Sequence, residues 1–326
     1  MTPKILPTEF TINMYLDKIM ILQQSDLPTV SSINYFDENS PCHIYFICRR
    51  PRVTIKADSL IATDETITMT FRVQRQENFE EYTYTFQNEF GTKDITIESE
   101  YPYSIFSFIK DGESILKCNA AVFLQSVPRY YTNADFLDLE ILYIGQSYGV
   151  EGARTAPDRL KSHSTLQGIY AEAIQKNPDS EIWLALTSFA QINLMMMDGR
   201  TIFSEEELKE DKERFMKVHH KLNYEGINEQ QKINFTEAAL IKYFQPPYNI
   251  EYKNTFPNPA HKTYAECYEL DINSVAIELD TYESINGYVY SEAANTRFIH
   301  MQHFFLHSPE ERRSMFDIEA MFKKKE

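Results

Sequence analysis

The stretch LYIGQSYGVEGARTAPDRLKSH, residues 142–163, is the part of the sequence that decides the fold. Its first residues end an apolar strand, and the small and polar residues after Gly145 indicate a loop. Pro157 then fits the first turn of a helix, because proline has the right φ for that position and the missing N–H costs nothing there. The stretch therefore predicts a strand, a loop and a helix that together carry tyrosine, arginine and histidine.

The size and charge of the chain limit its possible functions. With 326 residues, 43% of them hydrophobic, it is long enough for a sizeable core and for more than one domain. Its net charge of −16 repels polyphosphates at long range, which argues against tight, sequence-blind binding to duplex DNA. Between residues 141 and 176 the charges nearly cancel: Arg154, Arg159, Lys161 and Lys176 stand against Glu151, Asp158 and Glu172.

The cysteines and the apolar segments predict a cytoplasmic protein. Cys42, Cys48, Cys118 and Cys267 are scattered without a C-x-x-C pair, which suits a reducing compartment and disfavours a structural zinc site. The first twenty residues lack the basic and apolar regions of a signal peptide. No segment is apolar over the length of a membrane span, so we expect no membrane association.

The first third of the chain has the period of β-strands. Ile67, Met69, Phe71 and Val73 alternate with polar residues, as half-buried antiparallel strands do, and similar alternation continues to about residue 110. We therefore predict an N-terminal β-rich domain over residues 1–115, built as a β-sandwich or a strongly twisted sheet. No metal-ligand or nucleophile spacing occurs in it.

The pattern changes after residue 115. Apolar runs predict strands at 121–124, 141–144 and 182–186, and the capping box Ser204-x-x-Glu207 predicts a helix over 204–222. A shorter helix is expected from about Phe235 to Phe244, before Pro246-Pro247. Residues 263–326 return to alternation, and we predict a β-hairpin with a turn at Asn286-Gly287 and a final helix from Ser308-Pro309.

Several polar residues of the middle region are suited to phosphodiester chemistry. Arg159 and His163 are four residues apart, so they lie on one face of a helix, and Tyr143 ends the strand before them. Farther along, Glu237 and Asn249 flank the shorter helix. A guanidinium binds phosphate, a carboxylate holds a divalent metal, and a phenol or imidazole moves a proton. These are the parts of a metal-assisted phosphodiesterase.

The same residues resemble the motifs of the GIY-YIG nuclease family. Tyr143-Ile144-Gly145 is similar to the second motif, and Arg159-x-x-x-His163 to the helix motif. Residues 237–249, from Glu237 to the Pro-Pro-Tyr-Asn that ends in Asn249, resemble the last motifs. The best match to the first motif is Ala121-Val122-Phe123, which lacks the tyrosine hydroxyl.

The resemblance implies an α+β fold and a DNA-cleaving activity. The GIY-YIG-like three-stranded antiparallel sheet with flanking helices would occupy residues 116–262. Glu237 would bind Mg²⁺ or Mn²⁺, Arg159 would neutralise the phosphate in the transition state, Tyr143 or His163 would activate water, and Asn249 would fix the local geometry. The implied partner is DNA, in a restriction-like or phage-defence role, with the β-rich flanks contacting a protein partner or a second copy.

Simpler interpretations exist for each residue. Tyr143 on an apolar strand is by itself a core residue, and Arg159 and His163 could form a solvated helix face. Asn234 and Glu237 fit a capping box, so Glu237 could serve only its helix. For the whole chain, the alternatives are a catalytically inactive GIY-YIG-derived module that binds or senses nucleic acid, and a scaffold for protein interactions.

Overall fold

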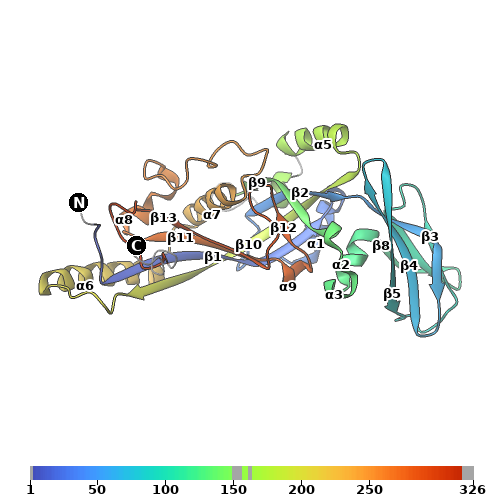
Figure 1. Cartoon of the computed structure of the whole chain (residues 1–326), viewed down its shortest axis with the longest axis horizontal. Coiled ribbons are helices and arrows are strands. Elements are labelled where there is room, and N and C mark those ends of the chain that lie inside the picture. The colour runs from blue at the N-terminus through green and yellow to red at the C-terminus, as the bar shows by residue number, and fades with distance from the viewer. Residues whose placement is uncertain (1–2, 149–155, 161–163, 318–326) are drawn as a thin grey trace, which may run out of the picture.

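The computed structural model describes residues 3–148, 156–160 and 164–317 (Figure 1). The strands are β1 (Thr8–Leu22), β2 (Ile44–Pro51), β3 (Val53–Ala62), β4 (Thr66–Arg75), β5 (Asn78–Gln87), β6 (Ile95–Ser99), β7 (Ile105–Lys110), β8 (Glu113–Asn119), β9 (Leu139–Gln146), β10 (Ser180–Met197), β11 (Ser274–Asp280), β12 (Val289–Tyr290) and β13 (Ile299–Phe305). The helices are α1 (Leu27–Ile33), α2 (Ala120–Ser126), α3 (Arg129–Thr132), α4 (Ala156–Leu160), α5 (Ser164–Lys176), α6 (Glu205–His220), α7 (Glu229–Phe244), α8 (Ala265–Glu269) and α9 (Tyr282–Ile285).

A curled seven-stranded mixed sheet forms the body of the molecule. Its strand order is β12-β9-β2-β10-β1-β11-β13. The pairs β12–β9 and β1–β11 are parallel, and the other neighbours are antiparallel. The sheet takes strands from all three ranges that the sequence separates at residues 115 and 262. The prediction of a fold that combines helices and strands is confirmed, but the central sheet has seven strands of mixed direction instead of three antiparallel ones.

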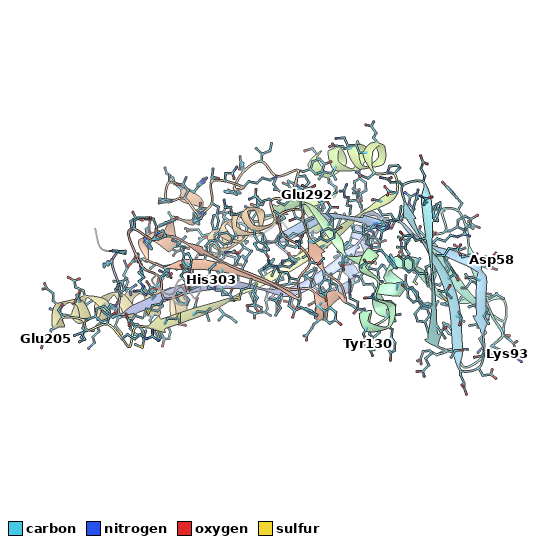
Figure 2. All side chains as sticks on the ribbon, viewed as in Figure 1. Asp58, Lys93, Tyr130, Glu205, Glu292 and His303 are labelled. Atoms are coloured by element: carbon cyan, nitrogen blue, oxygen red, sulfur yellow. The ribbon has the colours of Figure 1, made fainter. Side chains whose placement is uncertain are left out.

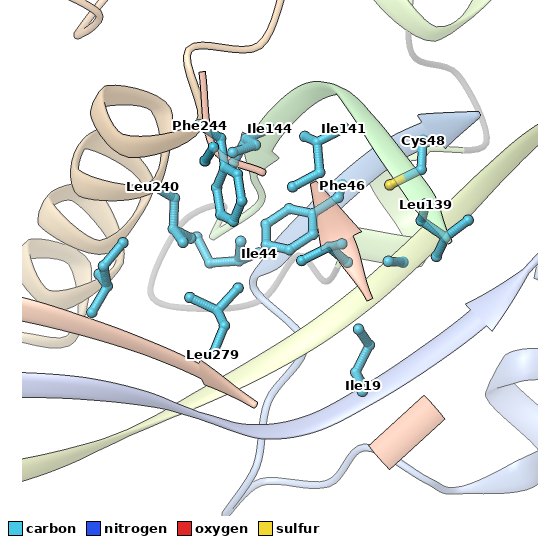
Figure 3. Packing of buried hydrophobic residues seen from close by; sticks show 14 of the residues in the cluster. Ile19, Ile44, Phe46, Cys48, Leu139, Ile141, Ile144, Leu240, Phe244 and Leu279 are labelled. Atoms are coloured by element: carbon cyan, nitrogen blue, oxygen red, sulfur yellow. The ribbon is translucent and has the colours of Figure 1, made fainter. Parts of the chain in front are cut away.

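Strand β2 is buried on both faces of this sheet. Tyr45 and Ile47 pack into the cluster beneath α4 and α5, whereas Ile44 and Phe46 pack on the opposite side. Figure 3 shows Ile44 and Phe46 meeting side chains of α7. A strand covered on both faces reads as a continuous apolar run rather than an alternating one. The run IYFIC, residues 44–48, has this character.

The alternating strands predicted for the front of the chain are confirmed. They form two three-stranded antiparallel sheets, β3-β4-β5 and β6-β7-β8, at one end of the molecule (Figure 1). Phe71 of β4 and Phe106 of β7 meet between the sheets, with ring centroids 6.4 Å apart. Together residues 53–119, which we call the β-insertion, separate β2 from β9 along the chain. Figure 2 labels Asp58 and Lys93 at its far end.

The strand predicted at Ala121-Val122-Phe123 is wrong, because this segment is helix α2. The Asn119 side chain caps the helix by accepting a hydrogen bond from the Ala121 N–H at 2.9 Å. Phe123 packs within the β-insertion, with its ring centroid 5.5 Å from that of Phe106. A short apolar run fits a buried strand and a buried helix equally well, and here the cap decides between them.

The C-terminal range contains the predicted pair of antiparallel strands, β11 and β13. Their connection is longer than a hairpin, and Asn286, with φ of 49°, ends the short helix α9 instead of forming a two-residue turn. The helix predicted from Ser308-Pro309 is wrong for the described residues, because 308–317 contain turns and an isolated β-bridge from Arg312 to Lys4 but no helix. Ser308 and Glu311 do exchange capping hydrogen bonds, but no helix follows within that range.

Helix α7 begins earlier than the sequence predicts. Its N-cap is Asn228, whose side-chain oxygen accepts hydrogen bonds from the N–H groups of Gln230 and Gln231 at 3.0 and 3.3 Å. Asn234 and Glu237 therefore lie in the helix interior, and the interpretation of Glu237 as a capping-box residue is wrong. The predicted capping box at Ser204 and Glu207 is confirmed at the start of α6.

We expect Asn228→Ala to lower the free energy of unfolding by about 1 kcal/mol, because it leaves two N–H groups of the first turn without a side-chain acceptor. Asn228→Asp keeps that acceptor and should stay near the parent. Urea unfolding followed by circular dichroism measures both. An alanine variant as stable as the aspartate variant would contradict the assignment of the cap.

Candidate active site

Tyr45 and Gly145 lie opposite each other where β2 pairs with β9. An added Cβ at Gly145 would lie 2.6 Å from Cζ of Tyr45 and 2.8 Å from Cε1 of Tyr143, and closer still to the Tyr45 hydroxyl oxygen. Carbon atoms are in ordinary contact at about 3.5–4.0 Å, so no side chain fits there. The glycine after Ile144 is therefore required because the Tyr45 ring crosses its backbone.

Tyr143 lies on the same face of the sheet as Tyr45. The two ring centroids are 6.3 Å apart; Tyr45 is fully buried, and Tyr143 is half-buried. Both rings contact the apolar cluster that contains Ala156 and Leu160 of α4. The N–H of Ala156 donates to the carbonyl of Cys42 at 2.9 Å, which ties α4 to the chain just before β2.

The helix residues predicted for the site are only partly described. The backbone of Arg159 belongs to α4, the helix that packs over Tyr45 and Tyr143. The side chain of Arg159 and the whole of His163 lie outside the described residues. The structure therefore brings the backbone of Arg159 to the tyrosine face and does not address His163.

Glu237 reaches the same end of β9 from the opposite face of the sheet. It lies on the sheet-facing side of α7 with 9% of its surface exposed. The Gln146 side-chain Nε2 donates to Glu237 Oε2 and to Asn234 Oδ1, both at 2.8 Å. Because Gln146 directly follows Gly145, this amide joins the helix carboxylate to β9, the strand that carries Tyr143.

Asn249 fastens the loop after α7 to β9. Its side chain accepts a hydrogen bond from the Ile144 N–H at 2.9 Å and donates to the Ile144 carbonyl at 2.8 Å. The backbone N–H of Tyr248 donates to the Leu142 carbonyl at 3.1 Å. The loop thus pairs with β9 much as an additional strand would, and it holds the end of α7 against the sheet.

Two nearby groups are unsuited to act as bases or nucleophiles at neutral pH. Burial, together with a hydrogen bond to Glu172, raises the pKa of the Tyr248 hydroxyl to about 12. Burial also raises the pKa of the Cys42 thiol to about 12. Both side chains therefore stay protonated at neutral pH.

Sequence reasoning missed Tyr45 and Gln146. A signal for Tyr45 was present: Ile44-Tyr45 opens an apolar strand just as Tyr143-Ile144 lies in one, but the β-insertion separates the two in the sequence. Gln146 stands beside the recognised Gly145, and only the position of α7 reveals that its amide meets Glu237. Pairing across a long insertion cannot be read from local patterns.

The oxygen-rich surroundings of Glu237 suit a hard divalent cation. Within residues 3–148, 156–160 and 164–317, no three His, Cys, Asp or Glu side chains are grouped to hold a metal. Mg²⁺ needs no such group, because it commonly uses one or two carboxylates, with water and substrate phosphate as its other ligands. Glu237 can supply the one carboxylate of such a site, with its Oε2 held by the side-chain N–H of Gln146.

We expect Gly145→Ala to destabilise the fold by about 1–3 kcal/mol, the usual cost of overpacking, because the new methyl group meets both tyrosine rings. Gly168→Ala is the matched control, since a Cβ at this helical position in α5 meets nothing within 4 Å. It should be neutral or stabilising by up to about 1 kcal/mol. Thermal unfolding of both variants tests this, and equal stabilities would refute the close approach at Gly145.

Comparisons with protein-family models, with curated proteins and with solved structures found no match to this chain. No helix within the described ranges is long and apolar enough to cross a membrane.

Proposed function

We propose that the chain is a metal-dependent DNA endonuclease with a GIY-YIG-like catalytic unit formed by β2, β9, β10, α4 and α7. The observation that carries the proposal is the antiparallel pairing of Tyr45 with Gly145, which places the tyrosine pair on one face of β9 and Gln146, bonded to Glu237, at the same strand end on the other face. Tyrosine, glutamate and asparagine thus come from four separate segments to one end of β9.

This arrangement supports residues 43–45 as the first motif, instead of residues 121–123, which the sequence favours. In the resembled family the first motif is Gly-Ile-Tyr, and Ile44-Tyr45 supplies its last two residues, with His43 at the glycine position. Ile44-Tyr45 runs beside Tyr143-Ile144-Gly145, whereas Phe123 packs in the β-insertion. On this alignment the tyrosine hydroxyl is present, and the β-insertion is an elaboration between the two motif strands.

The protein groups take distinct roles in the proposed hydrolysis of a DNA phosphodiester. Tyr45 or Tyr143, in its phenolate form, orients the attacking water and accepts its proton, with His163 as a further candidate base. The Arg159 guanidinium neutralises charge that develops on the phosphoryl oxygens, which Arg does well because it donates two parallel hydrogen bonds. Asn249 keeps β9 and the loop after α7 in register.

Glu237 is the residue that would hold Mg²⁺ or Mn²⁺, and Gln146 orients its carboxylate by donating to Oε2. When bound, such a cation polarises a phosphoryl oxygen and the leaving group. Partners that orient a ligand side chain usually matter for metal affinity, so Gln146 is a positioning residue in this proposal. The same chemistry supports DNA as the substrate class, and a restriction-like or defence role rests on the resemblance alone.

The main competing function is nucleic-acid binding without turnover. The net charge of −16 favours it, because an acidic chain gains little from long-range attraction to DNA. A cleavage assay decides between the two. Supercoiled plasmid, linear duplex and single strands are incubated with the protein, with and without Mn²⁺, and binding is measured in parallel. Binding of DNA without any Mn²⁺-dependent cleavage would favour the inactive module.

We expect Glu237→Gln to reduce cleavage by at least about 100-fold, because a neutral amide is a poor ligand for Mg²⁺ or Mn²⁺. The melting temperature should hold, since the glutamine oxygen can still accept from Gln146. Glu229→Gln is the matched control, as it removes a carboxylate in the exposed first turn of the same helix, where it pairs with Lys232. Equal cleavage by both variants would exclude Glu237 as the metal ligand.

We expect Tyr45→Phe to keep the fold and to lower the cleavage rate by about 100- to 10,000-fold, the usual contribution of a general acid–base group. Tyr143→Phe, measured beside it, shows which of the two tyrosines takes the proton. Tyr248→Phe serves as control, because its hydroxyl stays protonated at neutral pH. Single-turnover rates with saturating Mn²⁺ give the comparison, and parent rates in both tyrosine variants would remove the pair from the mechanism.

A further inference from the structure

The β-insertion carries a groove on its outer face, away from the proposed active site. Its volume is about 650 Å³, within the range of about 300–1,000 Å³ typical of ligand sites. The outer face of β3-β4-β5 forms the floor, and the segment 101–103 forms one wall. The lining residues are Arg52, Thr54, Arg72, Gln74, Phe79, Glu81, Tyr101, Pro102 and Tyr103.

Three aromatic rings border this groove and are open to solvent. The exposed fractions are 56% for Phe79, 84% for Tyr101 and 48% for Tyr103. The rings of Tyr101 and Tyr103 meet edge to face with centroids 6.1 Å apart. Exposed aromatic groups gathered in one concavity mark an interaction site, whereas single exposed apolar residues are ordinary.

The charges around the groove favour an anionic ligand, although the chain as a whole is acidic. One carboxylate, Glu81, is shared between two cations: Arg72 Nε donates to it at 2.9 Å, and Lys56 Nζ lies 3.3 Å from it. Arg52 adds a third cation, whose Nε is 3.7 Å from Glu181. Among the residues that line the groove, the two cations Arg52 and Arg72 outnumber the one carboxylate, Glu81.

We propose that this groove binds an unpaired stretch of nucleic acid, with bases stacked on the three rings and backbone phosphates against Arg52, Arg72 and Lys56. Aromatic platforms beside cations are the general means of holding single strands, because every base has a face that can stack. A proline-rich peptide would also use aromatic rings, but it gains nothing from the cations. The proposal rests on the proposed function only in taking the bound strand to be part of the substrate.

Strand β2 links the groove to the proposed active site. Ile44-Tyr45 at its start lies at the site, and Arg52, just after its end at Pro51, lines the groove. Eight strand residues span roughly 25 Å at about 3.3 Å per residue. The β-insertion would then select substrates that have an unpaired region at that distance.

The experiment measures binding of fluorescently labelled oligothymidylate (dT12) by anisotropy, without divalent metal, for the full chain. We expect the double variant Tyr101→Ala/Tyr103→Ala to bind at least about tenfold more weakly, because stacking contributes strongly per base. The matched control is Tyr130→Ala/Tyr131→Ala on α3, an equally exposed pair with ring centroids 4.2 Å apart (Figure 2 labels Tyr130). The control should bind as the parent does.

The charge contribution is tested with Arg52→Gln over a salt series. Removing one phosphate contact should reduce the slope of log affinity against log salt by about 0.7, the value for single strands. The proposal is overturned if dT12 does not bind, if both tyrosine pairs have the same effect, or if affinity is independent of salt. The dT12 assay contains no metal, so its result is independent of cleavage. If dT12 binds but the plasmid is not cleaved, the groove stays assigned and the nuclease function is rejected. If the plasmid is cleaved but dT12 does not bind, the groove assignment is rejected and the nuclease function stands.

Discussion

The pairing of β2 with β9 is the constraint on which the rest of the structure depends. It requires a glycine opposite Tyr45, because the aromatic ring crosses the backbone there and leaves no space for a Cβ. It also buries β2 on both faces, so helices must cover each side of the sheet. The candidate site follows from this arrangement, since the tyrosine rings occupy one face and α7 brings Glu237 to the other near the same strand end.

The two strands stay paired although the whole β-insertion lies between them in the sequence. Closing a long connection adds little entropic cost for each added residue, particularly when the connection folds on its own. A buried arginine helps to fasten the junction: Arg50 stacks on Trp183 with its guanidinium carbon 3.8 Å from the ring centroid, and it donates to Gln125 Oε1 of α2 at 3.0 Å. Burial lowers the pKa of the Arg50 guanidinium to about 9, so it remains charged at neutral pH.

The polar groups of the candidate site are buried, whereas those of the groove are exposed. Around Glu237 the polar groups are buried and hydrogen-bonded to one another, which holds a carboxylate in one orientation. In the groove, by contrast, rings and cations are open to solvent and can adapt to a flexible strand. The proposed nuclease would use both properties, and β2 connects the two places.

The local patterns were sufficient for the α/β class, for the alternating strands around Phe71 and for the capped helix after Ser204. They also singled out Tyr143, Glu237 and Asn249, because each stands in a short motif of unusual composition. They failed at Ala121–Phe123, where an apolar run fits both helix and strand, and they did not find Tyr45. Tertiary structure alone decides which strand lies beside β9, because that contact joins residues far apart in sequence and depends on a glycine that makes room for one particular ring.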